Sequence, residues 1–268
     1  MTRGESFSAS HIGFPPPLLG SLPIRLPVLW NADGLIAIWK PVGIPMLSAG
    51  GRDALSLERA INVQARAGKG ELARLGVDVV VPVIPLDPEC SGIALFATSR
   101  AATDCWRNAY GSQKFCMRFD LLCRRSPDVP ELTCDLPLAW AAKEGRAKVS
   151  HRYGKAAETR FRRVDGLGPI SLWQAETRLH RRHQTRVHAF ERGLGILGED
   201  RYGATPPLYL SEIKRAYRKR GAELPLHDGI CVHLKEVCWD GVRAGGGIVA
   251  PWPERMQVLW KQLERHSV

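Results

Sequence analysis

The sequence has no long apolar run and no cysteine pair spaced for a zinc knuckle. Its 268 residues include seven cysteines, an odd number, and none belongs to a C-x-x-C pair. A disulfide framework is therefore disfavoured, and we expect reduced thiols. No apolar segment approaches the ~20 residues that a membrane span needs, and the opening segment lacks the apolar core of a signal peptide. These absences predict a cytoplasmic protein that does not enter a membrane.

Nucleotide-binding loops and metal-binding spacings are also missing. The chain contains neither G-x-G-x-x-G nor a P-loop, and it shows no internal repeat. His183 and His188 are five positions apart with no glutamate directly after His183, and the arginines between and around them would repel a cation. We therefore predict no cofactor and no metal. A cysteine–histidine hydrolase stays a weak alternative, because no thiol stands in a context that marks a nucleophile.

Positive charge is what the sequence has in excess. It contains 38 Lys and Arg against 27 Asp and Glu, a formal net charge of +11. This balance favours a polyanionic partner, because neutralising phosphates releases condensed counterions. Nucleic acid is the leading candidate, and an ordinary basic surface is the alternative. The length and the 44% hydrophobic content suffice for one large domain or two small ones.

Local patterns predict an α+β fold. Residues 1–27 are rich in Pro, Gly and Ser and are expected to form a loosely packed, flexible arm. Segment 28–47 holds two apolar runs separated by N-A-D-G, which indicates a β-hairpin. Apolar or alternating runs predict strands at 77–84, 92–99, 114–123, 158–166, 169–179 and 230–239. Helices are expected in the first half of 53–75 after Asp53 or Ser56, after Ser99, and within 181–194. This mixture predicts a mostly antiparallel sheet with helices beside it.

Two short segments carry candidate chemistry. In PLDPECSG, residues 85–92, Asp87 lies in a loop between two expected strands. An acid there is either a cap for local backbone donors or a reagent, since a carboxylate at the mouth of a buried strand is costly unless paired. The segment RLHRRHQTRVH, residues 178–188, contains more cationic donors than a helix end uses. It indicates a site for a polyanion or a carboxylate.

These segments resemble motifs of the RluA-type pseudouridine synthases. PLDPECSGIALFA is similar to their H-R-L-D-x-x-T-S-G followed by an apolar strand, and RRHQTRVHAFERGLGILGEDRYG is similar to G-R-x-H-Q-x-R-x-H…G-x-P-I-x-G-D-x-x-Y-G. LIAIWKPVGIPM resembles their K-P-x-G-x-P loop, DLPLAW and GKAAETRFRRV resemble middle strands, and ICVHLKEVCW resembles the closing L-H-A-x-x-L strand. The matches run in family order from about residue 28 to about residue 240.

The resemblance implies a pseudouridine synthase fold: an α+β catalytic domain over 28–268, built on a long mixed sheet with a central cleft. No S4-type RNA-binding module is expected before it. The implied activity is isomerisation of uridine to pseudouridine in structured RNA, ribosomal or transfer RNA, with no cofactor and no metal. RNA is the expected partner, no protein partner is implied, and we expect a monomer.

Carried onto this chain, the family motifs place the nucleophilic carboxylate at Asp87 and an arginine that pairs with it at Arg186. The family's active-site tyrosine corresponds to Phe119, which keeps a ring but has no hydroxyl. It is expected to stack on the uracil, while water or Asp87 removes the proton from C5. Expected RNA-binding residues are Arg178, Arg181, Arg182, His183, Gln184, Lys40, Lys214, Arg215 and Arg218, with Lys219 and Arg220 in the same basic run.

The chain departs from the family pattern at four further positions. Ile84 and Pro85 replace a histidine and an arginine, Cys90 replaces a threonine, and His180 replaces a glycine. The change at Pro85 removes a donor that family members use against RNA. The alternative function is therefore a catalytically weakened relative that binds RNA as a chaperone or fold helper, and an unrelated basic enzyme is the remaining option.

Overall fold

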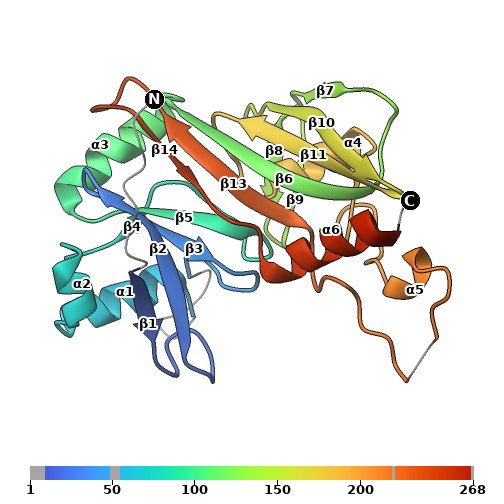
Figure 1. Ribbon diagram of the computed structural model, residues 1–268. Helices are drawn as coiled ribbons and strands as arrows, with labels where there is room; N and C mark the ends of the chain where they lie inside the picture. The colour runs from blue at the N-terminus through green and yellow to red at the C-terminus, as the bar shows by residue number, and fades with distance from the viewer. Residues whose placement is uncertain (1–9, 49–54, 219–220, 267–268) are drawn as a thin grey trace.

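Most of the apolar and alternating runs form β-strands, as predicted. The computed structural model describes residues 10–48, 55–218 and 221–266 (Figure 1). Its strands are β1 (His11–Phe14), β2 (Ile24–Ala32), β3 (Leu35–Lys40), β4 (Val81–Pro82), β5 (Ser91–Ala97), β6 (Phe115–Arg125), β7 (Glu131–Cys134), β8 (Leu138–Ala141), β9 (Arg146–Val149), β10 (Thr159–Leu167), β11 (Ile170–Thr177), β12 (Gly195–Ile196), β13 (Val232–Trp239) and β14 (Gly246–Val249). Its helices are α1 (Leu57–Arg66), α2 (Gly70–Arg74), α3 (Arg100–Gly111), α4 (Gln184–Glu191), α5 (Leu210–Ile213) and α6 (Glu254–His266).

One mixed sheet forms the body of the molecule. Its strand order is β1-β2-β3-β5-β13-β6-β11-β10-β7, with β4, β12 and β14 paired beside this path. Between the described strands, the pairing of β13 with β5 is parallel and the others are antiparallel. Strand β13 thus joins a first half, β1 to β5, to a second half that begins with β6. The predicted α+β class and mostly antiparallel sheet are confirmed.

The parallel contact of β5 with β13 depends on a residue without a side chain. Gly92 has a φ of +123°, and a Cβ added to it would lie 2.3 Å from the carbonyl oxygen of Leu234. Only glycine combines that backbone conformation with so close an approach. The Ser-Gly pair of the PLDPECSG segment is therefore the point where the two halves of the sheet meet, immediately after the loop that carries Asp87.

The predicted hairpin in segment 28–47 is present. Strands β2 and β3 pair up to Ala32 and Leu35. Asp33 and Gly34 between them have φ of +57° and +74°, as the two central residues of a type I′ turn do. The two apolar runs on either side of N-A-D-G therefore form neighbouring strands.

Two of the predicted helices begin at serine caps. Ser56 accepts a hydrogen bond from the backbone N–H of Arg59 at the start of α1, and Ser99 accepts one from Ala102 at the start of α3. Such side-chain acceptors satisfy backbone donors that have no partner within the helix. The helix expected within 181–194 is α4, whereas α2, α5 and α6 were not predicted.

The strand predicted at 77–84 is mostly absent. Only β4 within it is a strand, paired with the end of β5, and Val83 adds a single backbone hydrogen bond to Leu95. Val77 and Val80 are buried without strand pairing, and Pro82 cannot donate a backbone hydrogen bond, which confines it to a sheet edge or a strand end. Buried β-branched side chains in this irregular segment therefore give the same sequence pattern as a strand.

The expected loose arm over 1–27 is wrong for its described part, residues 10–27. Strand β1 pairs with the first half of β2, and Ile12, Phe14 and Leu26 are buried in the main hydrophobic core. Proline and glycine occupy the connection between the two strands, and the alternating apolar residues on either side pack. Residues 1–9 lie outside the described ranges.

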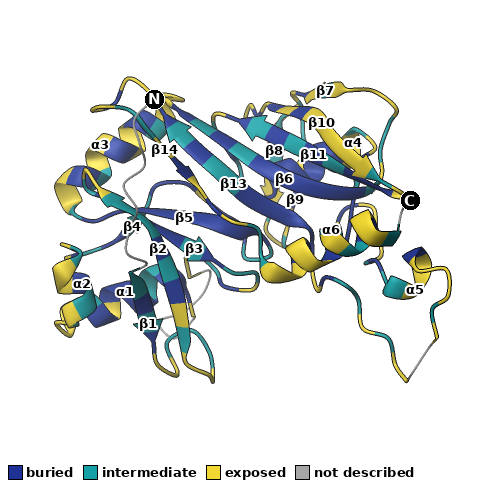
Figure 2. Ribbon diagram, viewed as in Figure 1, coloured by how far each residue is buried: buried dark blue, intermediate teal, exposed yellow. Residues whose placement is uncertain are grey.

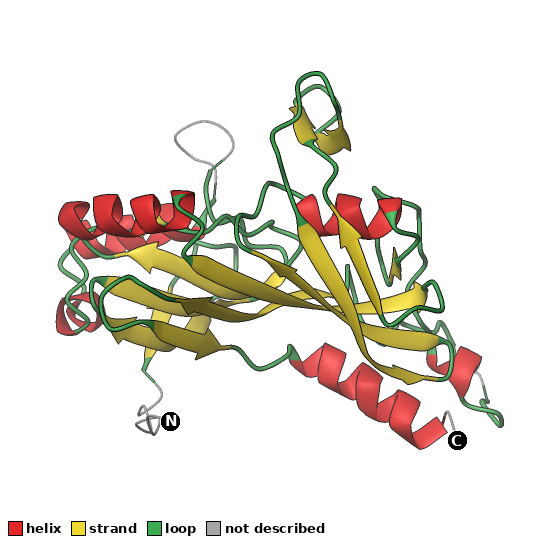
Figure 3. Cartoon of the chain, turned by 90° about the horizontal axis from the view of Figure 1, so that it is seen from above, coloured by secondary structure: helices red, strands yellow, loops and turns green. Residues whose placement is uncertain are grey.

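Helices cover parts of both faces of the sheet, and a small hairpin stands away from it (Figure 3). That hairpin is the separate two-stranded sheet of β8 and β9. Strand β5 is buried along its whole length, β6 and β13 beside the centre of the sheet are largely buried, and the outer faces of the helices are exposed (Figure 2). All seven cysteines are free. Within the described ranges, no helix combines the length and apolar character required to traverse a bilayer.

Candidate functional site

The loop before β5 holds Asp87 through its backbone. The backbone N–H of Cys90 donates to the carbonyl oxygen of Asp87 at 3.1 Å, which closes a turn. The carbonyl oxygen of Pro88 accepts from the N–H of Gly43 at 2.8 Å and from Nζ of Lys40 at 3.1 Å. The K-P-x-G-x-P segment therefore packs directly against the loop that carries the candidate reagent.

Lys40 is a structural residue rather than the expected RNA contact. It is completely buried, and its Nζ donates to the carbonyl oxygens of Pro41, Ile44 and Pro88 at 2.9–3.1 Å. These three bonds use all three ammonium hydrogens. Burial lowers the pKa of Lys40 to about 8, against the attraction of nearby acidic groups. The lysine fastens two loops together beneath Asp87.

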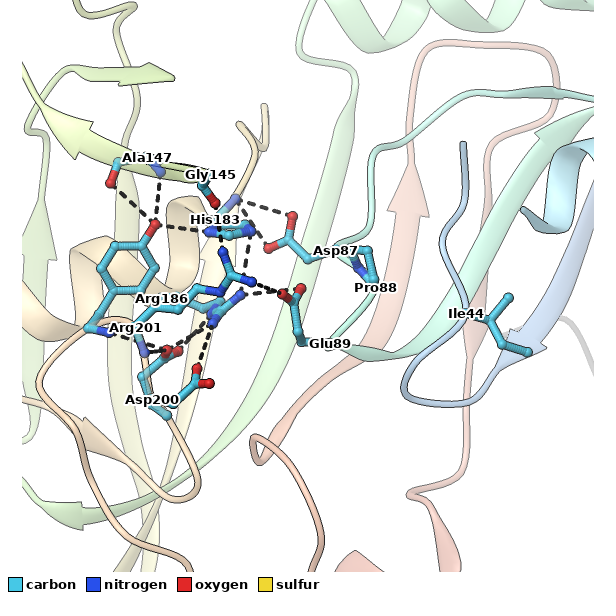
Figure 4. Close-up of polar contacts among 12 residues, drawn as sticks. Ile44, Asp87, Pro88, Glu89, Gly145, Ala147, His183, Arg186, Asp200 and Arg201 are labelled. Atoms are coloured by element: carbon cyan, nitrogen blue, oxygen red, sulfur yellow. Dashed lines mark hydrogen bonds and ion pairs between the residues drawn. The ribbon is translucent and has the colours of Figure 1, made fainter. Parts of the chain in front are cut away.

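Asp87 lies at the start of α4, far from it in sequence. Both carboxylate oxygens accept the backbone N–H of His183, at 3.2 and 3.1 Å, and the residue is only 4% exposed (Figure 4). His183 has a φ of +59°, a conformation that costs a non-glycine residue free energy and is often found at functional sites. One shared amide leaves most acceptor positions of a carboxylate unfilled. Asp87 therefore does not cap its own loop and keeps lone pairs for another group.

The protonation of Asp87 is set by opposing effects. Burial raises the pKa of Asp87, while the electrostatic influence of His183 and Arg186 and the His183 N–H hydrogen bond lower it. Burial prevails, so the net shift is upward. Because α4 begins at His183, its aligned peptide dipoles also favour a negative charge at this position. The site thus holds a desolvated carboxylate next to several groups that stabilise its ionised form.

The predicted ion pair between Asp87 and Arg186 is not formed. Arg186 instead makes a bidentate pair with Glu199, from Nε to Oε2 at 2.6 Å and from Nη2 to Oε1 at 2.8 Å. A third acid, Glu89, lies 3.4 Å from its Nη1. Burial lowers the pKa of Arg186, but Glu199 outweighs it and the net shift is upward. The prediction failed because Glu199 is a better placed partner, although the charge of Arg186 still acts on Asp87.

Residues that the sequence analysis did not single out complete this ionic cluster. The side chains of Arg186 and Glu199 are 0% and 1% exposed. Arg201 lies 3.5 Å from Glu89 and donates to the carbonyl oxygen of Gly145 at 2.7 Å (Figure 4). The available signal in the sequence was the group Glu199, Asp200 and Arg201 within GILGEDRYG. Its spacing does not tell which acid would contact which arginine.

His183 and Gln184 are buried, so the expectation that their side chains bind RNA is wrong for this conformation. Nδ1 of His183 lies 2.9 Å from the hydroxyl of Tyr202, and burial lowers the pKa of His183 to about 4, which leaves it neutral near pH 7. The Gln184 amide donates to the carbonyl oxygen of Glu158 and to the hydroxyl of Thr159. Both residues position the start of α4.

Phe119 is not open to a substrate in this conformation. It is completely buried, and the His180 ring packs on it with centroids 4.9 Å apart and planes inclined by 30°. His180 stands where the resembled family has glycine. Burial lowers the pKa of His180 to about 3, so this imidazole is neutral. Two departures from the family motif therefore meet in space, and the expected stacking surface of Phe119 is already occupied.

The remaining predicted RNA contacts are on the surface. Arg178 and Arg182 are exposed and Arg181 is partly exposed. All three lie in the segment just before α4 and before the His183 amide that binds Asp87. The exposed basic residues after α5 are Lys214, Arg215 and Arg218. Among the described contacts, no hydrogen bond or ion pair joins this second group to the Asp87 cluster. Lys219 and Arg220 lie outside the described ranges.

Comparison with known proteins finds proteins that are similar to this chain. No family model matches the chain. It is 26% identical over 247 residues to the ribosomal large subunit pseudouridine synthase D of Zymomonas mobilis, covering 90% of this chain and 73% of that protein. It is 24% identical over 270 residues to an RNA pseudouridine synthase of Chlorobaculum parvum, covering 97% and 82%.

Solved structures show the same fold. The human RNA pseudouridylate synthase domain-containing protein 4 superposes with a TM-score of 0.65 at 16% identity, over 88% of this chain and 92% of that one. The human domain-containing protein 1 gives 0.59 at 18% identity, over 85% and 84%. The predicted resemblance and fold are confirmed: the chain is similar in sequence to pseudouridine synthases and has the fold of pseudouridylate synthase domain proteins.

Proposed function

We propose that this relative of the pseudouridine synthases isomerises uridine to pseudouridine in RNA, with Asp87 as the reacting carboxylate. One observation carries the assignment. The acid of the PLDPECSG segment is desolvated, anchored by a single amide at a helix start, and adjacent to a buried guanidinium. A carboxylate in such a place has unused lone pairs and a strengthened interaction with a reacting atom.

The proposed reaction rearranges one nucleotide. The N1–C1′ bond breaks, the uracil turns, C5 bonds to C1′, C5 loses its proton and N1 gains one. The overall change is an isomerisation, so no co-reactant is consumed. Asp87 either attacks C1′ or assists elimination. Because Phe119 has no hydroxyl and is covered by His180, we assign the proton transfer at C5 to water or to Asp87.

Arg186 acts on the reaction through position and charge. Its bonds to Glu199 and its proximity to Glu89 tie α4 to the segment after β12 and to the loop that carries Asp87. Its charge also opposes the rise in the pKa of Asp87. We therefore describe Arg186 as a positioning residue that maintains the ionised acid, rather than as its direct partner.

The target base must leave its stack to reach Asp87. Enzymes that act on a base within folded RNA extrude the nucleotide into a pocket. With Asp87 only 4% exposed, residues above it must move to admit a uracil ring. The exposed Arg178, in the basic segment that precedes α4, is proposed to hold the flanking backbone.

The test is a map of pseudouridine in cellular RNA from a deletion strain complemented with wild-type protein, Asp87→Asn or Asp120→Asn. Asp120 is the matched control, because it is also a buried acid whose pKa is raised by burial. We expect the wild type and Asp120→Asn to restore the same sites and Asp87→Asn to restore none. Restoration by Asp87→Asn would rule out the assignment of Asp87.

The second candidate function is RNA binding without catalysis, which the loss of the hydroxyl at Phe119 favours. In that case the wild type and Asp87→Asn would leave identical pseudouridine maps, and both would bind RNA with the same salt dependence. The similarity to pseudouridine synthases along most of the chain favours the enzyme.

A further inference from the structure

The hairpin of β8 and β9 is fastened to the Asp87 site by three different contacts. The hydroxyl of Tyr202 accepts from the backbone N–H of Ala147 at 2.9 Å and donates to its carbonyl oxygen at 3.2 Å. Arg201 donates to Gly145 in the hairpin turn. The third contact is made by Trp140, whose ring meets the edge of the His183 ring at 5.3 Å between centroids, with an interplanar angle of 88°.

Trp140 therefore lies next to the residue whose backbone holds Asp87, yet it is partly open to solvent. Its side chain belongs to an element that stands off the main sheet (Figure 3), and 37% of the residue is exposed. An exposed aromatic ring is a surface on which proteins stack unpaired bases. The Trp140 ring is held against His183, whose amide binds Asp87.

Arg182 lies flat against this ring. The guanidinium carbon is 3.7 Å from the Trp140 ring centroid, and Arg182 is an exposed residue. Within the described part of the chain, no carboxylate lies at ion-pair distance from Arg182. Its charge is therefore compensated mainly by the indole face, and its outer surface is free to meet a second planar group.

We propose that Trp140 and Arg182 form a stacking platform for the base of a nucleotide that flanks the target uridine. The inference rests on the proposed function and adds a subsite to it. Proteins hold unstacked RNA bases on aromatic rings and on guanidinium planes. Here the guanidinium of Arg182 lies over the indole of Trp140, so a base would stack on the outer face of the guanidinium, one residue before the amide that binds Asp87. A base stacked there holds the strand while the neighbouring uridine turns into the site.

The platform differs from a phosphate contact in a measurable way. Lysine in place of Arg182 would keep the positive charge and the counterion release that binding phosphate causes, but it would lose the flat surface. Arg182→Lys therefore separates the two roles. Trp140→Phe keeps a ring, whereas Trp140→Ala removes it.

The chain offers a matched control on the loop after β9. There the guanidinium carbon of Arg152 lies 5.0 Å from the ring centroid of Tyr153, and Tyr153 is 72% exposed. Among the described contacts, none joins this pair to His183 or Asp87. Tyr153→Ala thus removes a comparable exposed ring and guanidinium contact without touching the proposed platform.

The experiment measures binding of full-length protein to two short single-stranded RNAs. One has a single uridine between adenosines, and the other replaces the flanking adenosines with abasic nucleotides. Base stacking on an aromatic side chain predicts roughly ten-fold weaker binding of the abasic RNA by the wild type. We expect Trp140→Ala and Arg182→Lys to lose most of this difference, and Trp140→Phe and Tyr153→Ala to keep it. The salt dependence of Arg182→Lys should equal that of the wild type.

Two results would overturn the platform. If Trp140→Ala weakens binding of both RNAs equally, the ring only docks the hairpin. If the wild type binds both RNAs equally, no flanking base is stacked. Either result leaves the proposed function standing as long as the wild type forms pseudouridine. Loss of that activity in the wild type would instead refute the function, whatever the binding comparison gave.

Discussion

Two arginines of this molecule each meet two glutamates, and only one of them belongs to the candidate site. Arg118, on β6, pairs with Glu176 at 2.9 Å and Glu236 at 2.8 Å across neighbouring strands, with the three side chains 30–36% exposed. Arg186 pairs with Glu199 and Glu89, and its own side chain is 0% exposed. Both clusters contain a guanidinium and carboxylates, but Arg186 is shielded from solvent and Arg118 is not.

This difference decides what each cluster does. Water screens the Arg118 cluster, so its pairs add little beyond joining β11, β6 and β13. Arg186 and Glu199 are buried, so each of these two charges depends on the other, since an unpaired charge there has no solvent to stabilise it, whereas Glu89 is 31% exposed. The buried arginine can therefore influence Asp87, which is equally desolvated. Desolvation, and not the number of ion pairs, distinguishes the functional region from the sheet.

The largest expected effect that separates the two clusters is on the free energy of unfolding. Arg186→Ala should cost about 3–5 kcal/mol, because it leaves Glu199 buried and unpaired, and pseudouridine formation should be lost. Arg118→Ala should cost about 1 kcal/mol or less. Denaturant titration of both variants measures this. Equal costs would mean that burial does not separate the clusters.

A smaller effect is expected for Lys40, a buried cation held by carbonyl groups instead of carboxylates. Lys40→Met should destabilise the fold by about 1–3 kcal/mol, because the ammonium group makes three hydrogen bonds to backbone carbonyl oxygens that methionine cannot make. The folded pKa of about 8 lies below the ordinary value of ~10.4, so the unfolded chain binds more protons between these values. Wild-type stability should therefore rise with pH across that window and that of Lys40→Met should not, as measured by denaturant titration at each pH.

The smallest effect concerns how the two clusters respond to acid. Burial raises the pKa of Glu176, but Arg118 outweighs it and the net shift is downward; the pKa of Asp87 is shifted upward. A lowered carboxyl pKa stabilises the fold above the unfolded value and is lost on acidification, whereas a raised one costs stability once the acid ionises. At neutral pH we expect Glu176→Gln to be less stable than the wild type by about 1 kcal/mol or less, and Asp87→Asn to be at least as stable.

The same comparison is checked by unfolding the three proteins between pH 4 and pH 7, a range above the ordinary aspartate pKa of ~3.9. The gap between Asp87→Asn and the wild type should widen with rising pH in favour of the variant. If Asp87→Asn instead loses stability relative to the wild type as pH rises, the folded protein stabilises the ionised form of Asp87. The contacts in the structure would then not account for the whole stabilisation of that form.

Local chemistry was predictable from the sequence, and long-range partners were not. The caps Ser56 and Ser99 and the turn at Asp33–Gly34 depend on neighbours within a few residues, so their patterns identified them. The carboxylate that pairs with Arg186 could not be predicted from neighbouring residues. Asp87 and Glu199 are both acids in matching segments, and only the packing of their loops determines that Glu199 receives the guanidinium.

The site residues show the same limit. Lys40, His183 and Gln184 looked like RNA contacts because polar residues in a motif resemble a binding surface. Their side chains are directed inward, where backbone carbonyls and hydroxyls need donors. Conversely, Trp140 gave no local signal, because its role depends on a hairpin that brings it to Arg182.

The insertion of β13 between β5 and β6 has a consequence for how the protein is made. Asp87 precedes β5 and Arg186 follows β6, so they belong to halves of the sheet that have no shared strand until residues 232–239 arrive. A nascent chain emerging from the ribosome carries both halves long before it carries this strand. Pairing between strands that are far apart in the sequence is slow, because the entropy of closing the long loop is lost before the new contacts stabilise the fold. The loop that carries Asp87 and the helix that carries Arg186 therefore flank halves of the sheet that β13 joins only after residues 232–239 have been synthesised.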